Sequence, residues 1–169
     1  MTNDWKTAPL SELIAHIVEA HHAYCRREMI HLQQMFRTTK GAAKLDAPFQ
    51  QLCAALSQHL AKEEMILFPL IAKFDAAQRE HTPPPQPAFG SMGNPIRMMV
   101  LEHGEAEKLL AQMRTDSGGF AAPADADAAL TELFITLRAF DADMNAHIDL
   151  EDNALFPRAI ALEQQLLGG

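Results

Sequence analysis

Apolar residues recur every three to four positions along four long segments of the chain, which contain few glycine or proline residues. Such spacing is typical of helices that bury one face. It predicts an all-α protein whose helix bounds are accurate to about two to four residues. The four predicted helices span residues of about 10–38, 46–75, 95–116 and 125–165.

The connections between these helices indicate how they are arranged. Short links join the first helix to the second and the third to the fourth, and short links connect antiparallel neighbours. The second connection, about 76–94, is long and rich in proline, and we expect an ordered crossover or a flexible loop. The sequence thus predicts an antiparallel up-down-up-down four-helix bundle that forms one domain over residues 1–169.

The second and fourth predicted helices share one sequence frame. In each, a histidine is followed four residues later by a glutamate and then by Leu-Phe-Pro, which ends at Pro69 in one helix and at Pro157 in the other. The repeat indicates two helical hairpins of one design. Because proline lacks a backbone donor, Pro69 and Pro157 are expected to kink or end their helices locally.

The repeated histidine and glutamate pairs suggest metal chemistry in a chain that has eight histidines. Side chains four residues apart lie on one helix face, so both can reach one metal ion. One such pair is weak evidence, since an exposed contact between them is more common. Two pairs in apolar helices favour a metal site, because a buried glutamate without a cation partner is costly.

A ligand set follows if each of the other two helices adds one histidine. With both carboxylates bridging, each metal has two imidazoles and open positions for a small molecule, a donor set that suits redox-active iron. In the first helix the pattern allows either His21 or His22, whose side chains diverge by about 100°. The candidate ligands are therefore His21 or His22, together with His59, Glu63, His103, His147 and Glu151.

Several neighbouring residues have open roles. Glu107, four residues after His103, is expected to be solvated or to contact a ligand from outside. Glu64, Glu102 and Asp149 flank candidate ligands and either orient imidazoles or are surface acids. The chain has only two cysteines and is long enough to fold without crosslinks, so a disulfide framework is not implied. Cys25 and Cys53 are expected to be buried thiols. His16, His31 and His81 are not expected to be ligands.

Charge and hydropathy argue against two classes of partner. The formal charge is −8, from 14 Lys+Arg against 22 Asp+Glu, and no segment gathers basic residues. Nucleic acid and anionic membrane surfaces are therefore not expected partners. The N-terminal residues lack a basic stretch followed by an apolar core, and no apolar run is long enough to span a bilayer. We expect a cytoplasmic protein.

Four stretches resemble the hemerythrin-like proteins, and most of all the repair-of-iron-centres di-iron proteins, which are linked to mending iron–sulfur clusters after nitrosative or oxidative damage. The resemblance implies a non-haem di-iron centre with an oxo or hydroxo bridge, places the helix-one ligand on His22, and keeps the other five ligands. The stretches are LIAHIVEAHHAYCRRE, LSQHLAKEEMILFP, MMVLEHGEAEKLL and MNAHIDLEDNALFP.

Two departures from the family pattern shape the expected function. Oxygen-carrying hemerythrins have a further histidine one turn from the third-helix ligand, where this chain has Met99 and Glu107, so oxygen transport is not expected. The longer repair proteins carry an N-terminal cysteine-containing domain, which we expect to be missing here.

The expected function is iron–sulfur cluster repair or another stress response. Its small ligand would be oxygen, nitric oxide or peroxide, and its protein partners would be damaged iron–sulfur proteins. One alternative is a module that binds or senses oxygen or nitric oxide without turnover. Another is a structural bundle that holds zinc, which the affinity order of divalent metals permits. The sequence does not predict the oligomeric state or distinguish turnover from binding.

Overall fold

The computed structural model describes residues 4–88 and 90–168 and is almost entirely helical. Three of its four long helices contain a short π-helical segment, so that each consists of several elements. The first long helix is α1 (Leu10–His16), η1 (Ile17–His22) and α2 (Ala23–Thr38), and the second is α3 (Ala43–Lys62), η2 (Glu63–Leu67) and α4 (Phe68–Glu80). The third is α5 (Gly93–Asp116), and the fourth is α6 (Ala128–Leu150), η3 (Glu151–Leu155) and α7 (Phe156–Leu167).

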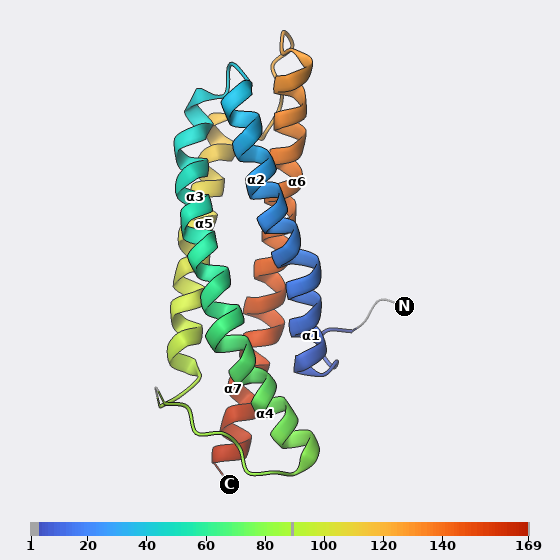
Figure 1. The fold of residues 1–169 in the computed structure, drawn as a ribbon, viewed down its shortest axis with the longest axis vertical. Helices are drawn as coiled ribbons and strands as arrows, with labels where there is room; N and C mark the ends of the chain where they lie inside the picture. The colour runs from blue at the N-terminus through green and yellow to red at the C-terminus, as the bar shows by residue number, and fades with distance from the viewer. Residues whose placement is uncertain (1–3, 89, 169) are drawn as a thin grey trace.

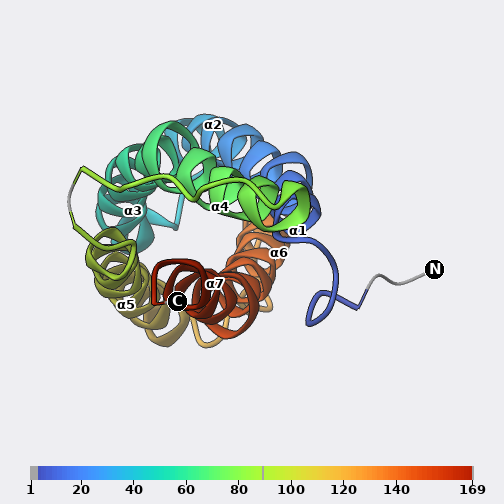
Figure 2. The ribbon, with the colours of Figure 1, turned by 90° about the horizontal axis from the view of Figure 1, so that it is seen from below.

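The four long helices form the predicted up-down-up-down bundle. Successive helices run in opposite directions along the long axis (Figure 1), and all four surround a common axis when the bundle is seen from below (Figure 2). Helix α2 contacts α3 and α6, and α5 contacts the same two helices, so neighbours in sequence are neighbours in space. The crossover between α4 and α5 runs across the lower end of the bundle in Figure 1.

Two helices have bounds that differ by three residues or more from those predicted. The second begins at Ala43 rather than near 46, with Pro48 already inside it, and continues to Glu80. It ends there because His81 adopts a left-handed conformation, with φ 54°. The fourth begins at Ala128 rather than near 125, because Asp127 caps it by accepting a hydrogen bond from the Leu130 backbone.

Neither Pro69 nor Pro157 ends its helix. Each is the second residue of an α-helical element that directly follows a π-helical segment, η2 or η3. A π segment inserts an extra residue into the helical turn and often marks a functional site. The expected local disturbance therefore takes the form of widened turns. The first residues of η2 and η3 are the candidate ligands Glu63 and Glu151, and η1 ends at His22.

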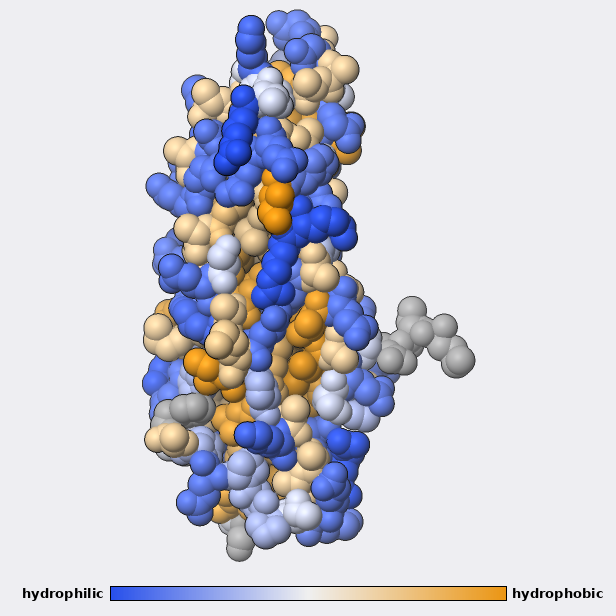
Figure 3. All heavy atoms as spheres, viewed as in Figure 1, coloured by the Kyte–Doolittle hydropathy of each residue, from blue (hydrophilic) through white to orange (hydrophobic). Residues whose placement is uncertain are grey.

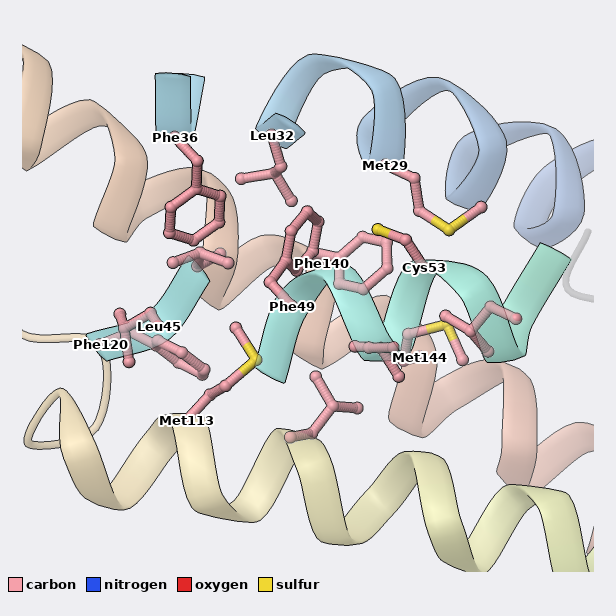
Figure 4. Close-up of a cluster of buried hydrophobic side chains, with 14 of the residues drawn as sticks. Met29, Leu32, Phe36, Leu45, Phe49, Cys53, Met113, Phe120, Phe140 and Met144 are labelled. Carbon is pink, nitrogen blue, oxygen red and sulfur yellow. The ribbon is translucent and has the colours of Figure 1, made fainter. Parts of the chain in front are cut away.

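Two apolar clusters fill the bundle. The upper cluster, as oriented in Figure 1, packs Phe49 against Phe36 and Phe140, with ring centroids 5.1 and 6.0 Å apart (Figure 4). The lower cluster lies between α1, α4, α7 and the start of α5, around residues such as Leu13 and Phe74. On each long helix the candidate ligands fall between residues of the two clusters. A polar layer thus divides the core at its waist.

The surface is mixed in character. On the face seen in Figure 3, hydrophilic side chains are interspersed with apolar ones along the length of the bundle. In the part of the chain that the structure describes, no helix combines the length and the apolar character needed to cross a membrane.

Candidate metal centre

All six candidate ligands meet at the waist of the bundle. Each is at most 3% exposed, so the cluster is shielded from water between the two apolar clusters. The first helix contributes His22, the second His59 and Glu63, the third His103, and the fourth His147 and Glu151.

The six side chains form two groups of four that share both carboxylates. One group joins His22 and His147 to Glu63 and Glu151, and the other joins His59 and His103 to the same two glutamates. Within each group the potential ligand atoms lie within 4.8 Å of one another. The Nε2 atoms of the two imidazoles are 3.1 Å apart in both groups. This arrangement can hold two cations side by side.

Each carboxylate reaches at least one imidazole of each group. Glu151 lies 3.1 Å from Nε2 of His147 through Oε1 and 3.1 Å from Nε2 of His103 through Oε2. Glu63 Oε2 lies 3.3 Å from His59 Nε2 and 3.5 Å from His22 Nε2.

These contacts are short, yet their angles are not those of hydrogen bonds. All four oxygens of Glu63 and Glu151 are buried without a hydrogen-bond partner among the described residues. A buried carboxylate in that state is costly unless a cation or a proton neutralises it, and four imidazole nitrogens aimed at the same space make a transition metal a suitable cation.

Three outer carboxylates, Glu64, Glu102 and Asp152, contact the far side of the imidazoles. His22 Nδ1 lies 2.7 Å from Glu64, His59 Nδ1 lies 3.0 Å from Glu102, and His103 Nδ1 lies 2.9 Å from Asp152. An ionised carboxylate only accepts, so each contact holds the proton on Nδ1 and leaves Nε2 free to bind a metal.

Sequence reasoning found only part of this outer layer. Glu64 and Glu102 orient imidazoles, one of the two roles open to them, but Asp149 instead accepts a hydrogen bond from Asn153 at 2.8 Å. Asp152 was missed. The signal was in the repeated frame, since an acidic residue directly follows both Glu63 and Glu151.

Burial and mutual contact separate the protonation states of His59 and His103. Burial lowers the pKa of His59 to about 4, with a further contribution from His103. Burial opposes the charged form of His103 too, but the hydrogen bond with Asp152 and the nearby carboxylate of Glu151 outweigh it and raise the pKa of His103 to about 9. Without a metal, this imidazole pair therefore holds its proton on His103 at neutral pH.

The two central carboxylates are also unlike. Burial, followed by the charge of Glu151, raises the pKa of Glu63 well above its usual range. Burial acts on Glu151 in the same direction, but the imidazoles of His147, His103 and His22 outweigh it and lower its pKa. In the metal-free centre, Glu63 therefore holds a proton more readily than Glu151 does.

Other residues singled out in the sequence lie outside the two groups. His21 turns its Nδ1 to Asp143 at 3.0 Å, and Glu107 is exposed. Cys25 and Cys53 are buried free thiols, and burial raises the pKa of each to about 12, with Cys53 contributing to the shift of Cys25. Neither cysteine is therefore a ready thiolate ligand.

A cavity gives access to one side of the centre. It lies between α3 and α5, has a volume of about 250 Å³, and is lined by His59 and His103 together with apolar residues such as Leu56 and Ala106. Lys62 forms an ion pair with Glu102 at the same cavity. A small molecule can approach the His59 and His103 group from this side.

Comparison with known proteins gives consistent matches. The family model described as the hemerythrin HHE cation binding domain matches residues 13–159. The chain is 34% identical over 170 residues to the iron–sulfur cluster repair protein YtfE of Escherichia coli O157:H7, a match that covers 95% of this chain and 70% of that protein. A protein of the same name from Citrobacter koseri is 33% identical, and this match also covers 95% of this chain and 70% of that protein.

Proposed function

The chain belongs to the hemerythrin HHE cation-binding family, and on this basis we propose that it is a non-haem di-iron protein that acts in iron–sulfur cluster repair under nitrosative or oxidative stress. The family membership confirms the resemblance found in the sequence. Repair is the role named for relatives that match 95% of this chain. The observation that carries the proposal is the pair of buried carboxylates shared by two groups of imidazoles.

We assign the ligands residue by residue. His22 and His147 would hold one iron ion and His59 and His103 the other, with Glu63 and Glu151 bridging the two. The orphaned carboxylate oxygens and the converging Nε2 atoms support this assignment. Two imidazoles and two shared carboxylates leave positions open on each metal. When bound, the two iron ions supply one-electron redox chemistry and sites for oxygen, nitric oxide or peroxide.

The surrounding residues control the centre. The outer carboxylates fix the orientation of three imidazoles and increase their basicity. The two apolar clusters exclude water along the bundle axis, so that small ligands enter through the cavity between α3 and α5. The ion pair of Lys62 with Glu102 holds the carboxylate that orients His59.

The repair assignment predicts transfer of iron to a damaged cluster. The iron-loaded protein, mixed with an iron–sulfur hydro-lyase inactivated by nitric oxide, should restore its activity well above the level reached with the same concentration of free ferrous iron. Metal-free protein should give no recovery. Equal recovery from free iron and from the loaded protein would contradict a repair role. It would not contradict the proposed metal centre.

A second function is supported by the cavity that reaches His59 and His103. A module that binds nitric oxide or oxygen without turnover would show reversible absorption changes and form no product. A structural zinc bundle would instead purify with stoichiometric zinc and show no absorption change on oxidation. Metal analysis and absorption spectra of freshly purified protein, with and without nitric oxide, separate these cases. The cytoplasmic setting stays a prediction.

Metal affinity should fall as the pH falls. His103 carries a proton below its pKa of about 9, and that proton must leave before Nε2 can bind a metal. Between pH about 9 and the ordinary histidine value of about 6.5, affinity should weaken by about tenfold per pH unit for each proton displaced. Zinc titration of metal-free protein at several pH values measures the slope. A constant affinity over this range would contradict the assignment of His103.

A further inference from the structure

The outer contacts of the four imidazoles follow a cycle around the bundle that is broken at one place. His22 on the first long helix contacts Glu64 on the second, His59 on the second contacts Glu102 on the third, and His103 on the third contacts Asp152 on the fourth. To close the cycle, His147 on the fourth helix would need a carboxylate from the first. An imidazole, that of His21, occupies this place.

His21 does not replace the missing carboxylate. Its ring is stacked on that of His147, with centroids 5.6 Å apart and planes within 10°. A stacked ring does not accept a hydrogen bond from an N–H that lies in the plane of its neighbour. His147 Nδ1 is accordingly buried without a hydrogen-bond partner among the described residues. Because this atom is on the far side of the ring from Nε2, a metal in the centre would not satisfy it.

A second unpartnered polar atom lies nearby on the same helix. Asp143 Oδ2 is buried and has no hydrogen-bond partner within the described parts of the chain, while Asp143 Oδ1 lies 3.0 Å from His21 Nδ1. Asp143 precedes His147 by four residues in α6, so the two side chains share a face one turn apart. Helical side chains lean toward the N-terminus, which directs the His147 ring toward the turn that carries Asp143.

Two such atoms provide the polar partners that a buried water molecule requires. We propose that Asp143 positions His147 through one buried water molecule, which accepts a hydrogen bond from His147 Nδ1 and donates one to Asp143 Oδ2. His21 holds Asp143 in place through Oδ1. This inference rests on the proposed di-metal centre and extends it. The His22 and His147 half of the centre then depends on Asp143, whereas the His59 and His103 half has its own outer carboxylates.

Cobalt(II) titration of metal-free protein, followed by visible absorption, tests this division. Wild-type protein should bind two equivalents. In Asp143→Ala, one equivalent should bind about 10- to 100-fold more weakly, the usual cost of losing an outer partner of a metal ligand, and the other should be unchanged. His21→Phe keeps a stacked ring but frees Asp143, and should weaken the same equivalent by a smaller factor.

Asp149→Ala is the matched control. Asp149 lies two residues from His147 on the same helix, and its carboxylate accepts a hydrogen bond from Asn153. Both equivalents should bind this variant as they bind wild type. In zinc-loaded protein labelled with nitrogen-15 in histidine, the Nδ1 resonance of His147 should shift in Asp143→Ala and stay in place in Asp149→Ala.

Three results would overturn the inference. Unchanged binding of both equivalents to Asp143→Ala would show that Asp143 does not act on His147, and equal weakening of both would show that it acts on the fold as a whole. If Asp149→Ala weakened the same equivalent as much as Asp143→Ala does, the effect would not be specific to Asp143. If Asp143→Ala does not fold by circular dichroism, Asp143→Leu, which fills a similar space but accepts no hydrogen bond, is judged by the same criteria. Failure of wild-type protein to bind two equivalents would instead refute the proposed centre itself.

Discussion

Replacing Glu151 with alanine should abolish binding of both iron ions. Glu151 is fully buried and belongs to both four-residue groups, with one oxygen 3.1 Å from His147 and the other 3.1 Å from His103. Its loss removes a ligand from each metal and the negative charge that offsets both. We expect the affinity for each metal to fall by more than about 100-fold, beyond the loss usual for an outer partner. Iron analysis and the absorption spectrum of the purified variant measure the effect.

Two other variants provide the comparison. His22→Ala removes a ligand from one group only and should leave one metal bound. Glu107→Ala removes an exposed carboxylate four residues after His103 and should leave both metals bound. Circular dichroism should show that Glu151→Ala remains helical, since it removes a buried carboxylate that lacks a hydrogen-bond partner. Two iron ions per chain in Glu151→Ala would contradict the bridging role.

Removing the metal should lower the melting temperature substantially. The ligands come from all four long helices, so bound metal ions link the helices at the waist of the bundle. A ligand present at a thousand times its dissociation constant stabilises the folded state by about 4 kcal/mol. For a chain of this size, that corresponds to a decrease of roughly 8 to 16 °C on chelation. Thermal unfolding followed by circular dichroism, with and without a chelator, measures it.

The Glu151→Ala protein serves as the control for this experiment. Because it should bind no metal, the chelator should not change its melting temperature. Its melting temperature should lie below that of iron-loaded wild-type protein, because it lacks the bound metal that links the four helices. A wild-type protein that contains iron and melts at the same temperature after chelation would show that the metal does not hold the helices together.

The sequence predicted the fold because the bundle follows from local pattern. Apolar spacing marks the buried face of each helix, and short links require antiparallel neighbours. Helix ends were harder to place. Both Asp125 and Asp127 can cap a helix, and only the packed structure shows that Asp127 does so. The π-helical segments were not predicted, because no local residue preference distinguishes them from a kink before Pro69 or Pro157.

The candidate centre was predictable because its residues repeat at helical spacing within one sequence frame. The contacts that cross between helices were not. Asp152 approaches His103 only because the third and fourth helices pack in one register, and one sequence carries no direct record of that register. For the same reason the pattern left His21 and His22 as alternatives. The structure puts His22 in the cluster and stacks His21 beside it, against Asp143.

The polar waist also has a consequence for how the molecule opens. Apolar contacts that make folding cooperative are concentrated in the upper and lower clusters, with only the charged layer between them. Proteins open in contiguous units whose free energies of opening differ, and a polar layer of this kind forms a boundary between two such units. Local opening of the lower end would expose the metal ligands while the upper end stays folded. Exchange of iron with solvent or with another protein then requires only partial unfolding of the bundle.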